Sequence, residues 1–292
     1  MAYKDFVAAV AKDLKTTPDE LLSRPRTFML NTNHRGRGLV KTLKELDVDL
    51  KGKNVLDIGC AYGGMSIECA KEGASAIGVD VVDKNLGYAR ANAIGEGDVT
   101  FHNCDATSNK LLEIVGSNWA DLIIINDVFE HIYDTPRLLE NIVSVAKKGA
   151  LLYYVVPNGK AVRFVLSEGH RKVFAVSLAD PDCWHYFVPG RPRIFYRRWA
   201  YFNALFREFG MEHSADLNRY CDDPRAEIEL GLARILEELD THRFEQDDAN
   251  TIAREEVEKY RIEVQTDLAN MTDRQLDHKY VIDFWRGILR IG

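Results

Sequence analysis

Acidic side chains recur at the ends of apolar segments in the first half of the chain. Asp57, Asp80, Asp105 and Asp127 each stand at or near the last residue of such a segment. A carboxylate in this place can accept hydrogen bonds from the hydroxyl or amino groups of a ligand, and it attracts a cation. Four acids in equivalent places predict a ligand site that several segments build together.

The stretch VLDIGCAYGG, residues 55–64, sets three glycines behind the first apolar segment. A glycine turn between a strand and a helix is typical of nucleotide sites, and dinucleotide sites use G-x-G-x-x-G. Here Ala61 takes the place of the middle glycine, and its methyl group hinders the close approach of a pyrophosphate. Asp57, two residues before Gly59, adds a negative charge that suits a cationic ligand. A nicotinamide-dependent oxidoreductase is therefore the least favoured enzyme class.

The elements that position these residues alternate regularly between residues 53 and 158. We expect strands over 54–59, 75–80, 99–105, 120–127 and 149–158, and helices over 64–71, 83–93, 108–115 and 134–149, with Asp83 and Thr135 as N-caps. Apolar runs that alternate with helices predict a parallel sheet covered on both faces. The expected fold class is therefore α/β, a doubly wound sheet that binds ligands at the carboxyl ends of its strands.

The second half of the chain divides by charge. Residues 157–210 hold nine Lys/Arg and four acids, whereas residues 222–278 hold seven Lys/Arg and 17 acids in a helical pattern. A sixth strand is expected over 211–217 and a last one over 280–291, beside it. The expected division is an N-terminal helical segment covering the site (1–52), a core (53–158), a basic substrate-covering segment (159–221), an acidic helical insertion (222–278) and a final strand (279–292).

Composition limits the class of protein. The chain has 292 residues, 46% of them hydrophobic, and a formal net charge of −7, which argues against a general nucleic-acid binder. The five cysteines form no CxxC pair, as expected for reduced thiols in the cytoplasm. The N-terminal stretch has no signal-peptide pattern, and the longest apolar runs are too short to cross a membrane. A soluble, cytoplasmic protein is expected.

The motifs in order resemble a known family. VLDIGCAYGG, then GVD, NCD and NDVFEHIYD, at the ends of the first four strands, are similar to the class I S-adenosylmethionine-dependent methyltransferases. They resemble in particular the branch that methylates small molecules such as quinones and sugars. The likeness covers about residues 38–160. It implies a mostly parallel, seven-stranded Rossmann-like sheet, here with a helical addition, and S-adenosyl-L-methionine as the cofactor.

The resemblance also implies roles for single residues. Asp80 would accept hydrogen bonds from both ribose hydroxyls, and Val81 would lie against the adenine. Asp105, with Ala106 nearby, would accept from the adenine amino group. The methionine end of the cofactor would lie against a set at the first and fourth strands, namely Asp57, Gly59, Cys60, Ala61, Gly63, Asn126 and Asp127.

Methyl transfer to a hydroxyl group can require a general base, and histidine suits that role near neutral pH. His131 in FEHIYD follows the fourth strand and is the first candidate, although the Glu-His pair there could instead hold the loop in place. His170 is the second candidate, and His185 is a rival to both. Asp180, Asp182, Cys183 and His185 match no strong ligand spacing, so no metal site is expected.

The basic segment bears on the acceptor. Arginine makes fork-like contacts to phosphate and carboxylate groups, so Arg163, Arg191 and Arg193, with Arg35 and His185, predict an anionic small molecule as substrate. The alternative is that these arginines pair with the acidic helices, within the chain or across a homodimer.

The function that the sequence favours is O-methylation of a small anionic metabolite, such as a phosphorylated, nucleotide-linked or carboxylated compound, or a sugar. One alternative is an N-methyltransferase acting on a small molecule; another is an RNA methyltransferase, although nucleic acid is disfavoured by the net charge. A third alternative is a scaffold that binds S-adenosylmethionine without catalysis.

Overall fold

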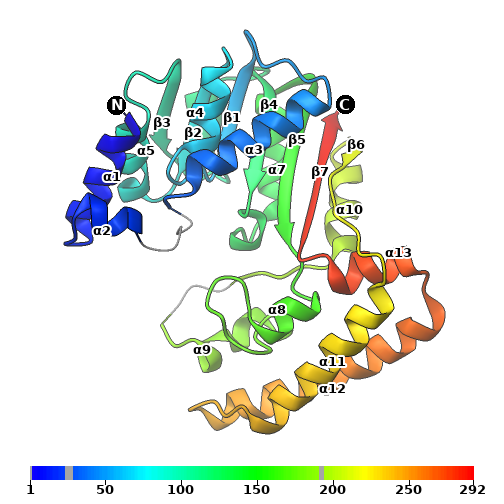
Figure 1. Cartoon of the computed structure of the whole chain (residues 1–292). Coiled ribbons are helices and arrows are strands. Elements are labelled where there is room, and N and C mark those ends of the chain that lie inside the picture. Colours follow the sequence, from blue (N-terminus) through cyan, green and yellow to red (C-terminus); the bar gives the residue numbers. More distant parts are fainter. Residues whose placement is uncertain (1, 24–28, 191–193) are drawn as a thin grey trace.

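The protein is described from a computed structural model that covers residues 2–23, 29–190 and 194–292. Its centre is a seven-stranded sheet in the order β3-β2-β1-β4-β5-β7-β6 (Figure 1). The strands are β1 Asn54–Ile58, β2 Ser75–Asp80, β3 Val99–Asn103, β4 Ala120–Asn126, β5 Ala146–Pro157, β6 Met211–Asp216 and β7 Phe284–Ile291. The first five are parallel, and β7 runs antiparallel to both β5 and β6. The predicted doubly wound α/β fold is therefore confirmed.

Helices cover both faces of this sheet. Those of the first 210 residues are α1 Ala2–Asp13, α2 Pro18–Ser23, α3 Thr32–Glu45, α4 Gly64–Lys71, α5 Asp83–Asn92, α6 Lys110–Val115, α7 Thr135–Val145, α8 Val162–Leu166, α9 Trp184–Phe187 and α10 Trp199–Glu208, with short 3-10 turns η1 Phe129–His131 and η2 Pro181–Cys183. Apolar side chains of α6, α7 and α10 pack on one face. Those of α3, α4 and α5 pack on the other, as the buried-strand pattern requires.

The acidic region folds as a helical addition, formed by α11 Pro224–Thr241, α12 Asp247–Asn270, α13 Asp273–Leu276 and the π-helical turn η3 Asp277–Val281. It lies between β6 and β7, which are neighbours in the sheet. Its apolar stripe, Val257, Tyr260 and Val264, packs in a second core with α8 and α9. In Figure 1 this addition lies below the sheet, and β5 runs toward it.

Several predicted boundaries were wrong. Asp83 is the first residue of α5 and Val82 its N-cap, and Asp134, not Thr135, caps α7. The Asp134 side chain accepts from the Arg137 amide at 3.0 Å, which Thr135, already helical, cannot do. The last strand begins only at Phe284, because the residues before it continue the helical addition.

Helix α3 is locked against α4 by close contact of their backbones. A Cβ atom added at Gly36 would lie 2.2 Å from the carbonyl oxygen of Gly64, and one added at Gly64 would lie 2.3 Å from Thr32. The Gly64 amide, at the start of α4, donates to the Thr32 hydroxyl at 3.1 Å. This contact fixes the first turns of α3, and with them Arg35, over the carboxyl edge of the sheet.

Replacing Gly36 by Ala should lower the free energy of unfolding by about 1–3 kcal/mol, because the new methyl group overpacks the contact between the two helices. Gly38→Ala is the matched control on the same helix, since an added Cβ there meets nothing within 4 Å. It should be neutral, or stabilising by up to about 1 kcal/mol. Chemical denaturation of both variants measures the difference, and equal stabilities would contradict the close approach.

Candidate active site

The glycine turn after β1 contacts the ends of two neighbouring strands, β2 and β4. Gly59 and Gly63 have positive φ angles of 71° and 74°, and Ala61 also has a positive φ, of 46°. The Gly59 and Cys60 amides donate to the Val79 carbonyl at 2.8 and 3.0 Å, which ties the turn to β2. A Cβ at Gly59 would lie 2.3 Å from the Val128 side chain, just after β4. The turn therefore needs glycine at residue 59 for both its φ angle and its packing.

Asp57 is buried below this turn. Its Oδ2 accepts from the Ser66 hydroxyl at 2.7 Å and from the Ser66 amide at 3.2 Å. Burial raises the pKa of Asp57 to about 6, although the two hydrogen bonds from Ser66 oppose that rise. A carboxyl group that titrates near pH 6 is half-ionised there, so a cation beside it would favour the ionised form.

Asp80 and Val81 stand at the end of β2. Asp80 accepts from the Ala61 amide at 3.0 Å through Oδ2 and from the Val82 amide at 2.8 Å through Oδ1. Each carboxylate oxygen has a second lone pair for a ligand donor. Val81, beside it, is 64% exposed, which is unusual for its residue type. A fixed carboxylate next to an uncovered apolar side chain suits a ribose with an attached base.

Asp105 and Ala106 follow β3. Asp105 is exposed, and its Oδ1 accepts from the Thr107 amide at 2.9 Å and the Thr107 hydroxyl at 2.7 Å. The Ala106 carbonyl accepts from the Asn141 side chain at 2.8 Å, which anchors this loop to α7. These contacts hold Asp105 in a defined place beyond the end of the strand.

Asp127 follows β4 with a positive φ of 57°. Its Oδ2 accepts from Asn126 at 2.8 Å and pairs with Arg35 of α3 at 3.0 Å. Its Oδ1 is buried and has no hydrogen-bond partner among the described residues. Burial raises the pKa of Asp127, although the Arg35 charge opposes that rise. One oxygen of this group is thus left for a ligand.

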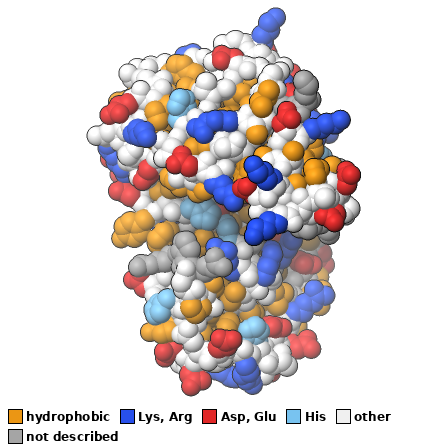
Figure 2. Space-filling view, turned by 90° about the vertical axis from the view of Figure 1, so that its left-hand side faces the viewer, with side chains coloured by type: hydrophobic (Ala, Val, Ile, Leu, Met, Phe, Trp, Pro, Cys, Tyr) orange, Lys and Arg blue, Asp and Glu red, His pale blue; other side chains and the backbone are white. Residues whose placement is uncertain are grey.

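The two predicted catalytic histidines lie side by side, although 39 positions separate them in the sequence. The rings of His131 and His170 are 4.9 Å apart, edge to face. Burial and then the charge of His170 lower the pKa of His131 to about 4, so His131 is neutral at pH 7. Figure 2 shows histidine side chains at the waist between the sheet and the helical half of the molecule.

Glu130 lies beneath this pair. Its Oε1 is 3.8 Å from His131 Nε2 and 3.6 Å from His170 Nε2. Both of its carboxyl oxygens are buried without a hydrogen-bond partner in the part of the chain that the structure describes. Burial raises the pKa of Glu130 well above its usual range, which favours the neutral acid.

Glu168 supports His170 from the other side. It accepts from His170 Nδ1 at 2.9 Å, from the Arg171 amide at 2.5 Å and from the Tyr196 hydroxyl. Burial opposes ionisation, but the hydrogen bonds from His170 and Tyr196 outweigh it and lower the pKa of Glu168 to about 2. An ionised Glu168 keeps the proton of His170 on Nδ1 and leaves Nε2 as an acceptor.

The other residues predicted to bind substrate are dispersed. Arg163 is exposed and pairs with Asp283 at 2.7 Å, and His185 contacts the Asp182 carbonyl at 2.8 Å near α9. Arg191 and Arg193 lie outside the described residues. Of the five, Arg35 is the one that the described structure brings to the strand ends.

Sequence reasoning missed Glu168 and Tyr196. A carboxylate two residues before a histidine, as in SEGHRK, was the available signal for Glu168. Among the described residues, Glu130, His131 and His170 form the single group of three potential metal ligands, with ligand atoms within 4.8 Å of one another. None of the four residues weighed for a metal in the sequence belongs to that group.

The chain is similar in sequence to a family model and to curated proteins. A family model described as a methyltransferase domain matches residues 32–214. Two curated relatives are ubiquinone biosynthesis O-methyltransferases. The one from Sinorhizobium fredii is 33% identical over 109 residues, 37% of this chain and 43% of that protein. The one from Hahella chejuensis is 26% identical over 180 residues, 58% and 75% of the two chains. The chain thus spans less than half of the first relative.

Two solved structures share the fold. Magnesium protoporphyrin IX methyltransferase from Synechocystis PCC 6803, with bound S-adenosylhomocysteine, has a TM-score of 0.50 and 20% identity, and the match covers 75% of this chain and 92% of that one. An S-adenosylmethionine-dependent methyltransferase from Mesorhizobium loti has a TM-score of 0.51 and 17% identity, with 86% and 96% covered.

The fold is therefore that of the class I S-adenosylmethionine-dependent methyltransferases, as the sequence motifs predicted. The chain belongs to the methyltransferase-domain family. In the described part of the chain, no helix combines the length and the apolar character that crossing a membrane demands.

The position of His131 beside His170 predicts that the pKa of His131 is unusually low and depends on His170. His170→Ala should raise the pKa of His131 from about 4 toward its usual value of 6.5, because the electrostatic effect of His170 and part of the burial are removed. Titration of the imidazole signals by NMR measures this change. His185→Ala, at a distant histidine, is the control and should leave the His131 pKa unchanged. A wild-type His131 pKa of 6.5 or above would contradict the geometry.

Proposed function

We propose that the protein is an enzyme that transfers a methyl group from S-adenosylmethionine to an oxygen of a small molecule. One observation carries this proposal. The residues that suit a nucleoside, at the ends of β2 and β3, lie at the same edge of the sheet as the pair His131 and His170. The family match and the O-methyltransferase names of the curated relatives support it.

The residues at the strand ends fit the cofactor. Asp80 would accept from the ribose hydroxyls through its free lone pairs, and the exposed Val81 would be covered by the adenine. Asp105, in its fixed loop, would accept from the adenine amino group. Asp57 would face the positively charged methionine end, and so would Oδ1 of Asp127, which has no hydrogen-bond partner among the described residues. When bound, the cofactor supplies an electrophilic methyl group beside these residues.

The glycine turn completes the cradle. Gly59, Cys60, Ala61 and Gly63 would present backbone to the methionine end, with Asn126 and Ala106 at the borders of the site. The charge balance suits the ligand, because carboxyl groups gather where a sulfonium and an amino group would lie.

His170 is the better supported general base, ahead of His131. Glu168 accepts its Nδ1 proton and so directs the Nε2 lone pair away from Glu168. A base held in this way can take the proton of an acceptor hydroxyl as the oxygen is methylated. Glu168 is then a positioning residue, and His131, which stays neutral, is available for a hydrogen bond to the acceptor.

Arg171 would bind an anionic acceptor. The positive charge of Arg171 contributes to the low pKa of His131, so the guanidinium lies near that ring. Its side chain has no acidic partner among the described residues, and it could bind a carboxylate or phosphate of the acceptor. A cytoplasmic location and a homodimer stay predictions from the sequence.

One observation favours N-methylation as the second candidate. Glu130 and Asp127 leave three buried carboxyl oxygens without a hydrogen-bond donor in the described part of the chain. An amine acceptor would supply such donors, whereas a hydroxyl acceptor would supply only one. Identification of the methylated atom in the product distinguishes the two candidates.

Asp80→Asn should weaken the binding of S-adenosylhomocysteine about 10- to 100-fold, because a neutral amide accepts less strongly from ribose hydroxyls than a carboxylate does. Isothermal titration calorimetry measures the loss. Asp83→Asn, three residues further along the chain, is the matched control and should bind as the wild type does. If both variants bind equally well, Asp80 has no role in the cofactor site.

His170→Gln should lower the rate of methyl transfer about 10²- to 10⁴-fold, the range of general-base contributions. The assay follows radiolabelled methyl groups from S-adenosylmethionine into a panel of phenols, carboxylated phenols and amines. Glu168→Gln should lower the rate less and shift the pH profile, since it removes the carboxylate that orients His170. Affinity for S-adenosylhomocysteine should stay unchanged in both variants. A His170→Gln enzyme with the wild-type rate would exclude His170 as the base.

A further inference from the structure

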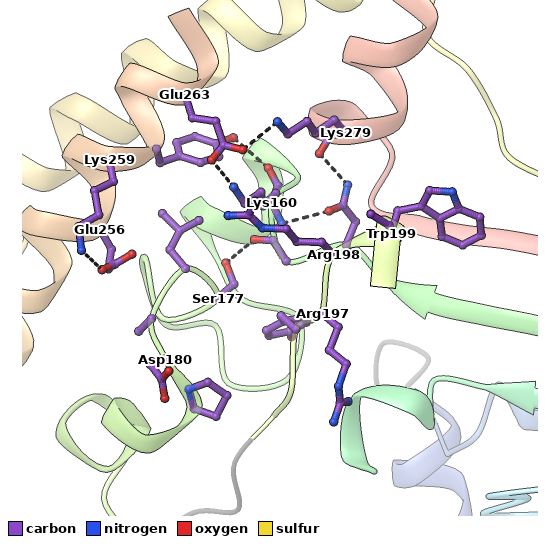
Figure 3. A pocket seen from close by; sticks show the side chains of 18 of the residues that line it. Lys160, Ser177, Asp180, Arg197, Arg198, Trp199, Glu256, Lys259, Glu263 and Lys279 are labelled. Atoms are coloured by element: carbon purple, nitrogen blue, oxygen red, sulfur yellow. Dashed lines mark hydrogen bonds and ion pairs between the residues drawn. The ribbon is translucent and has the colours of Figure 1, made fainter. Parts of the chain in front are cut away.

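A cavity lies between the helical addition and the basic segment. It is apart from the candidate active site at the ends of β1 to β4, which we call the strand-end site. The volume of the cavity is about 690 Å³. Five segments of the chain line it, together with Trp285 of β7: residues 158–160, 177–181, 196–200 and the facing sides of α12 and η3. Figure 3 shows basic and acidic side chains converging on its centre from α12, η3 and the end of β5. The methyl-transfer function proposed above makes no use of this cavity.

Positive charge exceeds negative charge along the wall. The cationic side chains are Lys160, Arg197, Arg198, Lys259 and Lys279, and the acidic ones are Asp180, Glu256 and Glu263. Glu263 pairs with Lys160 and, at 2.8 Å, with Lys279, which also pairs with Asp267 at 2.5 Å. Lys259 forms an ion pair with Glu256 at 2.6 Å. Each lysine of the wall thus has an acidic partner, whereas Arg197 and Arg198 have none among the described residues.

Of these two arginines, Arg198 is the one directed toward Lys160 in the cavity (Figure 3). Its guanidinium has no acidic partner among the described residues, and Figure 3 places it beside Lys160. Burial, and in part the charge of Arg198, lowers the pKa of Lys160, although Glu263 opposes this effect. Two cations that face one cavity repel each other, and an anion between them would remove the repulsion.

Aromatic side chains line the end of the cavity next to the sheet. The rings of Trp199 and Trp285 are 5.5 Å apart, and His278 stacks on Trp285 at 5.8 Å. All three line the cavity, and Tyr196 lines it as well. Apolar rings at one end and cations at the other suit a ligand with a flat ring and a negative charge.

The segment 196–198 separates this cavity from the histidine pair. Arg197 donates to the Tyr133 carbonyl at 2.7 Å and the Phe129 carbonyl at 3.4 Å, and in Figure 3 it points away from Lys160 and Arg198. The Tyr196 hydroxyl is directed to Glu168 and His170. The two sites thus share a wall, and their ligands would bind on opposite sides of it.

We propose that this cavity is a binding site for a small aromatic anion, a carboxylate or a phosphate monoester, distinct from the methyl-transfer site. Arg198 and Lys160 bind the anionic group, and Trp199 with Trp285 contacts the ring. The site requires both the basic segment and the acidic helices, since each supplies part of the wall.

Titration calorimetry on the full chain tests the proposal with phenyl phosphate and benzoate as probes, and with benzyl alcohol as the neutral comparison. At least one anion should bind, and benzyl alcohol should not. Saturation with S-adenosylhomocysteine should leave the affinity unchanged, which separates this site from the cofactor site. Absence of heat with both anions, in protein shown to be folded by circular dichroism, would overturn the proposal.

Arg198→Ala should weaken binding of the anion at least tenfold, and Arg198→Lys should restore part of it. The control is Arg234→Ala, which removes an exposed arginine of α11 that lies outside the cavity. This variant should bind as the wild type does. An Arg198→Ala protein with unchanged affinity and unchanged thermal unfolding would show that the anion binds elsewhere and would overturn the assignment.

Discussion

The close backbone contact between α3 and α4 fixes the geometry of the strand-end site. Gly36 and Gly64 have no room for a side chain, and Thr32 accepts from the first amide of α4. The same packing that positions α4 behind the glycine turn therefore positions Arg35 above the end of β4. Asp127 meets Arg35 because of it. The residues proposed to bind the nucleoside and those proposed to border the acceptor are thus held by the same packing of α3 on α4.

Burial acts on the acids of this site in opposite ways, according to the donors around them. Glu130 and Glu168 are equally hidden, 1% and 0% exposed. Glu168 receives three hydrogen bonds and keeps a low pKa, whereas the Glu130 carboxyl group receives none from the described residues and has a raised pKa. A buried acid without a donor destabilises the fold unless it is neutral or a ligand supplies the donor. Such a destabilising acid is expected at a functional site, because a ligand that donates a hydrogen bond to it removes the cost.

The fold could be predicted from the sequence because its core strands are continuous apolar runs separated by amphipathic helices. Those runs predicted that Asp57 and Asp80 lie at the same edge of the sheet. The N-caps were missed by one residue, since Asp134 and Thr135 are both capping residue types and only backbone geometry decides between them.

The site was predictable in part. The meeting of His131 with His170 could not be derived, because residues 159–200 have no periodicity from which a path could be read. The contact between Glu168 and Tyr196 could not be predicted for the same reason, because both residues lie in that segment. The charge of the basic segment predicted a negative partner, either an anionic acceptor or the acidic helices. It could not show that Arg163 pairs with Asp283 while Arg198 keeps no acidic partner in the described structure.

The most direct test of the central claim is a crystal structure of the full chain with S-adenosylhomocysteine. We expect the Asp80 carboxylate to contact both ribose hydroxyls and Val81 to cover one face of the adenine. We expect the sulfur atom to lie on the side of Asp127 and the two histidines. A nucleoside bound away from the end of β2, or a sulfur atom turned away from the histidine pair, would contradict the central claim.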